Sequence, residues 1–200
     1  MDKQPKMKTK MHKGRSDLIG EHRIGDAGQA IFAVLFVAVY VLDSFFLNFS
    51  TFLNDYVPNV IRVIAGTIVL IVSGFLSFNG MSIVFDEVRE KPEVIRKGVF
   101  SIVRHPLYLG EILLYIGLIC FSLSIASMVV WLLTTVFLYK ISCYEEKILL
   151  EHFGEEYRVY MKEVPMWLPR ISHLFGGKNN HRHRETRSIN VGIYLINFRL

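Results

Sequence analysis

Two clusters of polar residues lie beside long apolar runs and carry groups that could do chemistry. Arg104 and His105, followed by Tyr108, come directly before one apolar run. Glu145 and Glu146 come at the end of the next apolar run. Arginine and histidine can donate hydrogen bonds to a carboxylate, whereas glutamates accept them from hydroxyl groups or balance a cation. We expect the two clusters to meet at one membrane face if the runs between them form a helical hairpin.

The composition is that of a membrane protein rather than of an average soluble domain. Of the 200 residues, 52% are hydrophobic and 20% are charged, and the charges are absent from long segments. The net charge of +5 does not predict a nucleic-acid partner, because the basic residues flank apolar runs as they do in cytoplasmic loops. Cys120 and Cys143 fall within apolar runs, which indicates buried hydrophobic residues and neither a disulfide nor a metal site.

The apolar runs predict an all-α, polytopic membrane protein with about four transmembrane helices. A helix needs about 20 mostly apolar residues to cross a bilayer. The last two spans form the expected helical hairpin, and the charged, periodic segment after them predicts a cytoplasmic C-terminal helix. Gly66 and Gly74, both in the second span, are expected to allow close helix packing. The predicted spans are residues 27–49, 60–78, 107–121 and 126–143.

The distribution of basic residues predicts the topology. The basic arm 1–26 holds seven Lys and Arg residues, the connection 79–105 holds five, and the segment 140–200 holds ten. The other two connections, 48–59 and 122–126, hold none. Because cytoplasmic loops carry an excess of Lys and Arg, both termini and both polar clusters are expected on the cytoplasmic side of an integral membrane protein.

The polar clusters belong to two longer runs that resemble a known family. The run from Gly98 to Gly110, GVFSIVRHPLYLG, resembles the signature of the integral-membrane methyltransferases, which include isoprenylcysteine carboxyl methyltransferases and phospholipid methyltransferases. The run from Glu145 to Tyr160 resembles the second signature of that family. The order, the spacing and the hairpin between them also match, and the resemblance covers about residues 60–170.

The resemblance implies a membrane methyltransferase that uses S-adenosylmethionine, and we expect residues 27–170 to form that domain. The composition of residues 171–200 predicts a flexible polar tail. S-adenosylmethionine carries an amino acid head, a ribose and a positive sulfur, which together would engage all the polar groups of the two clusters. No metal is implied. The catalytic residues implied are Arg104, Glu145 and Arg170. The cofactor-binding residues implied are Arg104, His105, Tyr108, Gly110, Glu145 and Glu146.

The methyl acceptor is less well defined than the cofactor. The resemblance favours a lipid-like acceptor drawn from the membrane, with a prenylated cysteine carboxylate as the leading example and a phospholipid amine or a small thiol as alternatives. Many family members have an arginine where this chain has Met166, so either Arg170 substitutes for that arginine or the acceptor site differs from theirs. Asp43, Arg62 and Glu111 are candidates for the acceptor side of the site.

Two other classes of function stay open at this point. Membrane sterol reductases have a similar architecture and use a nicotinamide cofactor, and fold alone does not separate them from methyltransferases. A non-catalytic membrane scaffold would keep the helices without the chemistry. Charged residues cluster at the ends of spans in any membrane protein, so each cluster taken alone fits an interfacial anchor. The sequence does not indicate an oligomeric state.

Overall fold

A computed structural model describes residues 23–86 and 92–168, and these ranges contain helices and no strand. The chain divides into two compact units, residues 1–167 and 168–200, and all the helices described here belong to the first. Most of the predicted arm and the whole predicted tail, together with Arg170, lie outside the described residues. The main helices are α1 (Arg23–Val41), α2 (Asn59–Met81), α3 (Pro106–Ser122), α4 (Ile125–Phe153) and α5 (Glu155–Glu163).

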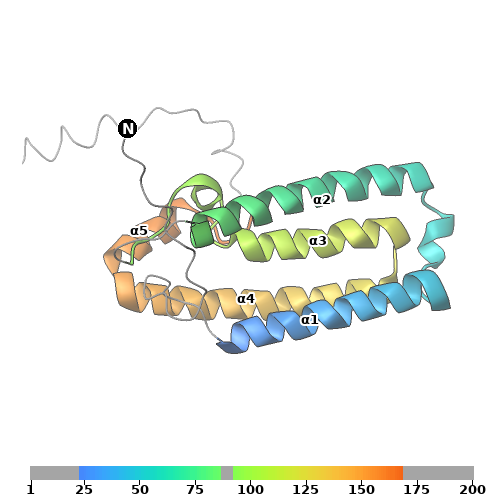
Figure 1. The fold of residues 1–200 in the computed structure, drawn as a ribbon, viewed down its shortest axis with the longest axis horizontal. Helices are drawn as coiled ribbons and strands as arrows, with labels where there is room; N and C mark the ends of the chain where they lie inside the picture. The colour runs from blue at the N-terminus through green and yellow to red at the C-terminus, as the bar shows by residue number, and fades with distance from the viewer. Residues whose placement is uncertain (1–22, 87–91, 169–200) are drawn as a thin grey trace, which may run out of the picture. The chain divides into compact units, whose positions relative to one another are not determined.

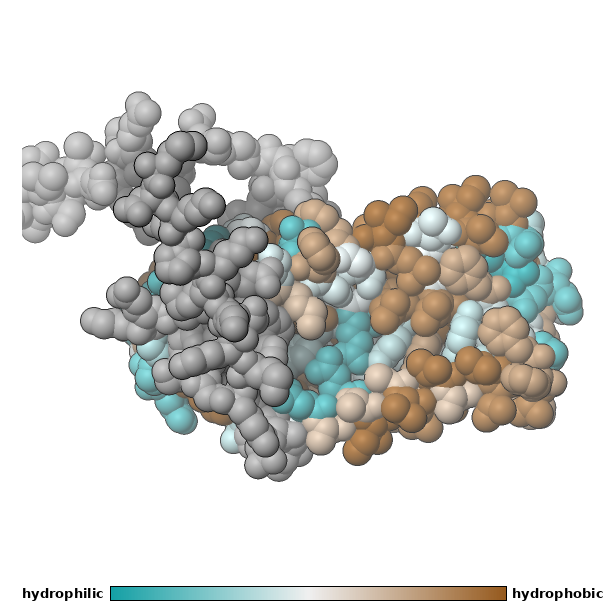
Figure 2. Space-filling view, in the orientation of Figure 1, coloured by the Kyte–Doolittle hydropathy of each residue, from teal (hydrophilic) through white to brown (hydrophobic). Residues whose placement is uncertain are grey.

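The helices confirm the predicted all-α, polytopic membrane fold. Three apolar stretches are long enough to cross a bilayer, namely Gly25–Leu47, Asn59–Val84 and Ile125–Phe153. The fourth apolar helix, α3, has 17 residues, or about 25 Å at 1.5 Å per residue. Large hydrophobic side chains on α1 and α2 are exposed, and Figure 2 shows broad hydrophobic surface over the bundle. Lipid would cover such a surface, so the chain is an integral membrane protein.

The hairpin between α3 and α4 is built from local sequence signals. Pro106 occupies the first turn of α3, where its missing N–H is not needed. Leu123 takes a left-handed conformation at φ 44° and ends α3. The Ser124 hydroxyl then accepts a hydrogen bond from the Ser127 amide at 3.1 Å and caps the start of α4. α4 runs without a break to Phe153, so the predicted span 126–143 and Glu145-Glu146 share one continuous helix.

α2 and α3 pack most closely of all the helix pairs, through small residues (Figure 1). A Cβ added to Gly66 would stand 2.9 Å from the Gly117 carbonyl oxygen. The Ser73 hydroxyl donates to the Gly110 carbonyl at 2.7 Å. The packing role predicted for Gly66 is confirmed, but the same role predicted for Gly74 is wrong, because nothing lies within 4 Å of its added Cβ. Ser73 follows Gly66 by seven residues, about two turns, and therefore shares its face.

α1 packs along α4 and completes the bundle. Gly28 lies against the Phe137 ring, where an added Cβ would overlap the ring. The Phe36 ring, which is fully buried, also stacks on Tyr115 of α3 with ring centroids 4.1 Å apart. The aromatic stack therefore ties the α1–α4 pair to the α2–α3 pair at the centre of the core.

Asp43 and Arg62, both candidates for the acceptor side, lie at the end of the bundle opposite the start of α3. The buried Asp43 carboxylate accepts hydrogen bonds from the Ser50 amide at 3.0 Å and from the Ser124 hydroxyl at 2.5 Å. Arg62 donates to the Phe121 carbonyl at 2.6 Å, near the C-terminal end of α3. Both side chains therefore fasten the connections at that end and do not reach Arg104.

The two glycines of α2 provide a matched test of this packing. Gly66→Ala should lower the free energy of unfolding by about 1–3 kcal/mol, because the Gly117 backbone has to move to admit the methyl group. Gly74→Ala should leave the stability unchanged or slightly higher, because it adds helix propensity in open space. Thermal unfolding of the two variants in one detergent measures the difference, and equal midpoints would contradict the packing described here.

Candidate functional site

The two predicted clusters meet at one end of the bundle, across the α3–α4 hairpin. The Tyr108 hydroxyl donates to Glu145 Oε1 at 2.5 Å. The His105 ring lies between the two glutamates, with Nδ1 3.6 Å from Glu145 Oε2 and Nε2 3.2 Å from Glu146 Oε1. The rings of His105 and Tyr108 stack with centroids 5.6 Å apart. With Arg104, which contacts Glu146 at 2.7 Å, the structure brings together five of the six residues predicted to bind the cofactor.

Arg104, the fifth of these residues, is engaged by protein acceptors. Its Nε donates to Glu146 Oε1 at 2.7 Å, and both side chains are over 90% buried. Its Nη1 donates to the carbonyls of Met161 at 2.9 Å and Val164 at 2.6 Å. Arg104 therefore joins the start of α3 to α4 and to the C-terminal end of α5, where free carbonyls favour a cation.

Gly110, the sixth residue predicted to bind the cofactor, faces α2 and not the polar cluster. A Cβ at this position would overlap the Ser77 hydroxyl and approach the Ser73 carbonyl at 3.4 Å. The close approach that Gly110 permits is therefore between two helices. Its contribution to the site is indirect, since it fixes the distance between α2 and the helix that carries Tyr108.

The chain after α5 pairs with the residues before α3 through its main chain. The Arg104 amide donates to the Pro165 carbonyl at 3.0 Å, and the His105 amide donates to the Met166 carbonyl at 3.2 Å. Because these contacts use backbone atoms, they do not depend on an arginine side chain at position 166. Arg170, one of the two alternatives considered for that arginine, lies outside the described residues.

Two tyrosines that pack α5 against the site were not among the predicted site residues. Tyr157 and Tyr160 are both buried, and the Tyr160 hydroxyl donates to the Phe100 carbonyl at 2.7 Å. Burial is the main cause that raises the pKa of both phenols above 10, so both stay neutral at physiological pH. Their spacing of three residues was the available signal, because it places both on one face of a helix.

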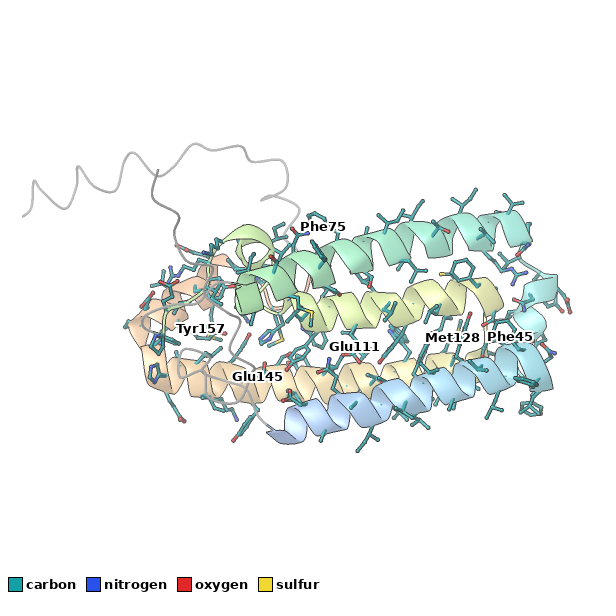
Figure 3. The ribbon with its side chains drawn as sticks, viewed as in Figure 1. Phe45, Phe75, Glu111, Met128, Glu145 and Tyr157 are labelled. Carbon is teal, nitrogen blue, oxygen red and sulfur yellow. The ribbon has the colours of Figure 1, made fainter. Side chains whose placement is uncertain are left out.

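Glu111, the remaining acceptor-side candidate, lies on α3 between Tyr108 and Tyr115. Its Oε1 accepts a hydrogen bond from the Tyr115 hydroxyl at 2.6 Å, and its Oε2 accepts one from Gln29 Nε2 of α1 at 2.5 Å. Figure 3 shows Glu111 on the side of α3 that faces α4, toward the end that carries Glu145. Of the three acceptor-side candidates, only Glu111 is close to the polar cluster.

The cluster has the chemistry of a site for a cationic ligand that carries hydroxyl groups. Carboxylate oxygens accept hydrogen bonds from hydroxyl groups, and stacked aromatic rings favour a cation over their faces. Within the described ranges, no group of three His, Cys, Asp or Glu residues is arranged to hold a metal ion.

Comparison of the sequence with known proteins identifies a family model that matches the segment containing the site. Residues 60–156 match the family model described as phospholipid methyltransferase. The match begins at the start of α2, includes the whole hairpin and ends in α5, so it contains both polar clusters. This segment is therefore similar to the phospholipid methyltransferase family. The resemblance drawn from the two signatures is therefore confirmed.

A curated relative has a narrower match to the chain. A methanethiol S-methyltransferase from Pseudomonas deceptionensis is 36% identical over 73 residues. These residues are 36% of this chain and 27% of the relative. The chain thus covers little more than a quarter of that relative's length.

The buried contacts of Arg104 predict a strict need for its guanidinium group. Arg104→Lys should lower the free energy of unfolding by about 1.5–3 kcal/mol, because one ammonium cannot reproduce the bonds to Glu146 and to two carbonyls. Arg158→Lys is the matched control, since Arg158 pairs with Glu155 on the exposed side of α5 and such pairs contribute little. Equal unfolding midpoints for the two variants would contradict this role of Arg104.

Proposed function

We propose that this chain transfers a methyl group from S-adenosylmethionine to a lipid-like acceptor at the membrane interface. The observation that carries the proposal is the contact of Tyr108 and His105 with Glu145 across the α3–α4 hairpin. This contact joins the first signature to the second, inside the segment that matches the methyltransferase family. The excess of basic residues in the neighbouring segments supports a cytoplasmic position for the site and for both termini.

The residues at the site fit S-adenosylmethionine. That molecule supplies a methyl group on a positively charged sulfur, which is a good leaving group. The Glu145 carboxylate can accept hydrogen bonds from ribose hydroxyl groups, and the stacked rings of His105 and Tyr108 offer a flat surface beside the carboxylates. The protein's main task in such a reaction is to align the acceptor with the methyl group and the sulfur.

The site residues divide into two roles under this proposal. Glu145, His105 and Tyr108 are the candidates for direct contact with the cofactor. Arg104, predicted to be catalytic, acts as a positioning residue, because its Nε and Nη1 bond to Glu146 and to carbonyls near the end of α5. Glu146 is its counter-charge and also orients His105.

The acceptor reaches the site from the bilayer in this proposal, while the cofactor enters from the aqueous side. The sequence resemblance puts a prenylated cysteine carboxylate first among the acceptors. The family description supports a phospholipid, and the relative named methanethiol S-methyltransferase supports a thiol. All three acceptors use the same cofactor, so cofactor binding is the first property to test.

Calorimetry with S-adenosylhomocysteine on the purified, detergent-solubilised protein tests the cofactor site. The wild type should bind in a saturable way, and His105→Ala and Glu145→Ala should each weaken binding roughly tenfold or more, because each removes a hydrogen-bonding or charged contact. Glu155→Gln, on the exposed side of α5, should bind like the wild type.

A folded wild type that does not bind S-adenosylhomocysteine would overturn the proposal. Titration with nicotinamide cofactors would follow, since binding of these would assign the chain to the reductase class. Wild-type affinity in both His105→Ala and Glu145→Ala would place the cofactor somewhere other than this cluster.

A further inference from the structure

Glu111 is a carboxylate inside the bundle that the cofactor site does not use. It follows Pro106 by five residues, which places it about 7.5 Å along the helix axis. It lies three residues after Tyr108 and four before Tyr115, and residues at these spacings lie on one side of a helix. The side of α3 that contributes Tyr108 to the cofactor site therefore continues, one turn further into the membrane, as Glu111.

The contacts of Glu111 do not balance the charge of a carboxylate. Gln29 and Tyr115 each donate to one of its two oxygens, but both donors are neutral, and a buried charge is usually paired with an opposite one. The α1 helix is already fixed to α3 by the stack of Phe36 on Tyr115. Ionisable residues within membrane helices are costly and usually mark a functional position. The charge of Glu111 is thus better explained by a ligand than by packing.

The charges of the described residues disfavour an acceptor that is itself a carboxylate. Glu111, Glu145 and Glu146 contribute three carboxylates on this side of the hairpin. Arg104 is paired with Glu146 at 2.7 Å, and the His105 ring lies between Glu145 and Glu146, so the carboxylates outnumber the groups that can carry positive charge. An acceptor carboxylate near Glu111 would meet a group of like charge, which costs free energy in a partly desolvated site. An ammonium group would be attracted, and a thiol would not be repelled.

We propose that Glu111 contacts the nucleophilic atom of the methyl acceptor and takes its proton, so that the acceptor is an amine or a thiol and not a carboxylate. This inference rests on the proposed methyl transfer. A carboxylate acceptor carries no proton at neutral pH and needs no base, whereas an ammonium or a thiol must lose one before it can attack.

The proton and the electron pairs balance in this step. The N–H or S–H proton passes to the Glu111 carboxylate, and the freed lone pair forms a bond to the methyl carbon. The bond between that carbon and the sulfonium sulfur breaks, and its electron pair stays on sulfur. Glu111 then releases its proton to water, so one proton leaves for each methyl group transferred.

The test compares Glu111→Gln with the wild type on three probes, each supplied with S-adenosylmethionine. The probes are phosphatidylethanolamine in vesicles, a short alkanethiol and N-acetyl-S-farnesylcysteine, whose acceptor is a carboxylate. The wild type should methylate the amine or the thiol in preference to the carboxylate, and which of the two it prefers identifies the acceptor. Glu111→Gln should lower kcat roughly 100-fold or more on that probe, as expected for loss of a general base.

Two further measurements separate a base from a structural residue. Activity of Glu111→Gln should rise toward the wild-type value as the pH approaches the pKa of the acceptor, because the acceptor then loses its proton to solvent. Binding of S-adenosylhomocysteine should change less than threefold. Glu155→Gln, which removes an exposed carboxylate from α5, is the matched control and should keep wild-type turnover on every probe.

The outcomes are distinct from those of the proposed function. A wild type that binds S-adenosylhomocysteine but methylates only the carboxylate probe, or none of the three, overturns the role of Glu111 while the cofactor site stands. Undiminished turnover of the amine or thiol by Glu111→Gln overturns it as well. If Glu111→Gln does not fold, Glu111→Asp keeps the carboxylate and should retain reduced turnover with the pH profile of the wild type, and a profile shifted to high pH would count against the proposal.

Discussion

The Arg104 side chain joins three parts of the chain that are far apart in the sequence. It starts at the turn before α3, meets Glu146 on α4, and bonds to carbonyls at the end of α5. The side chains of Arg104 and Glu146 are each more than 90% buried. Such an ion pair is stable only because the guanidinium also donates hydrogen bonds to backbone carbonyls. The same Glu146 oxygen contacts His105, so the orientation of the imidazole follows from the position of Arg104.

Within the membrane, close packing of α2 against α3 holds the helix that begins at the polar cluster. Gly66 and Gly110 let α2 and α3 approach until a serine hydroxyl meets a backbone carbonyl. Small residues at such contacts are the usual means of association between helices in lipid, where no hydrophobic effect drives them together. At the other end, Asp43 ties the connection after α1 to the start of α4. The helices that carry the two signatures are thereby held at both ends.

The sequence predicted the pairing of Tyr108 and His105 with Glu145, because two motifs joined by a hairpin bring their polar ends together. It did not predict that Arg104 would bond to carbonyls of the chain near α5, since that contact depends on how a distant segment docks and not on residue type. The error at Gly74 has a simpler cause. Gly74 follows Gly66 by eight residues, which is two full turns of the helix plus about 80°. The two glycines therefore point in different directions, and only the structure shows which face of α2 meets α3.

The length of α3 affects how a lipid would meet the site. At about 25 Å this helix is shorter than the roughly 30 Å of a bilayer's hydrocarbon core. A helix whose far end is anchored near the opposite surface therefore begins below the level of the lipid head groups. The bilayer thins locally around such a segment, or water descends to it. A lipid head group could then meet the start of α3 while its acyl chains stay in the membrane, which avoids the roughly 0.8 kcal/mol per CH₂ that extraction would cost.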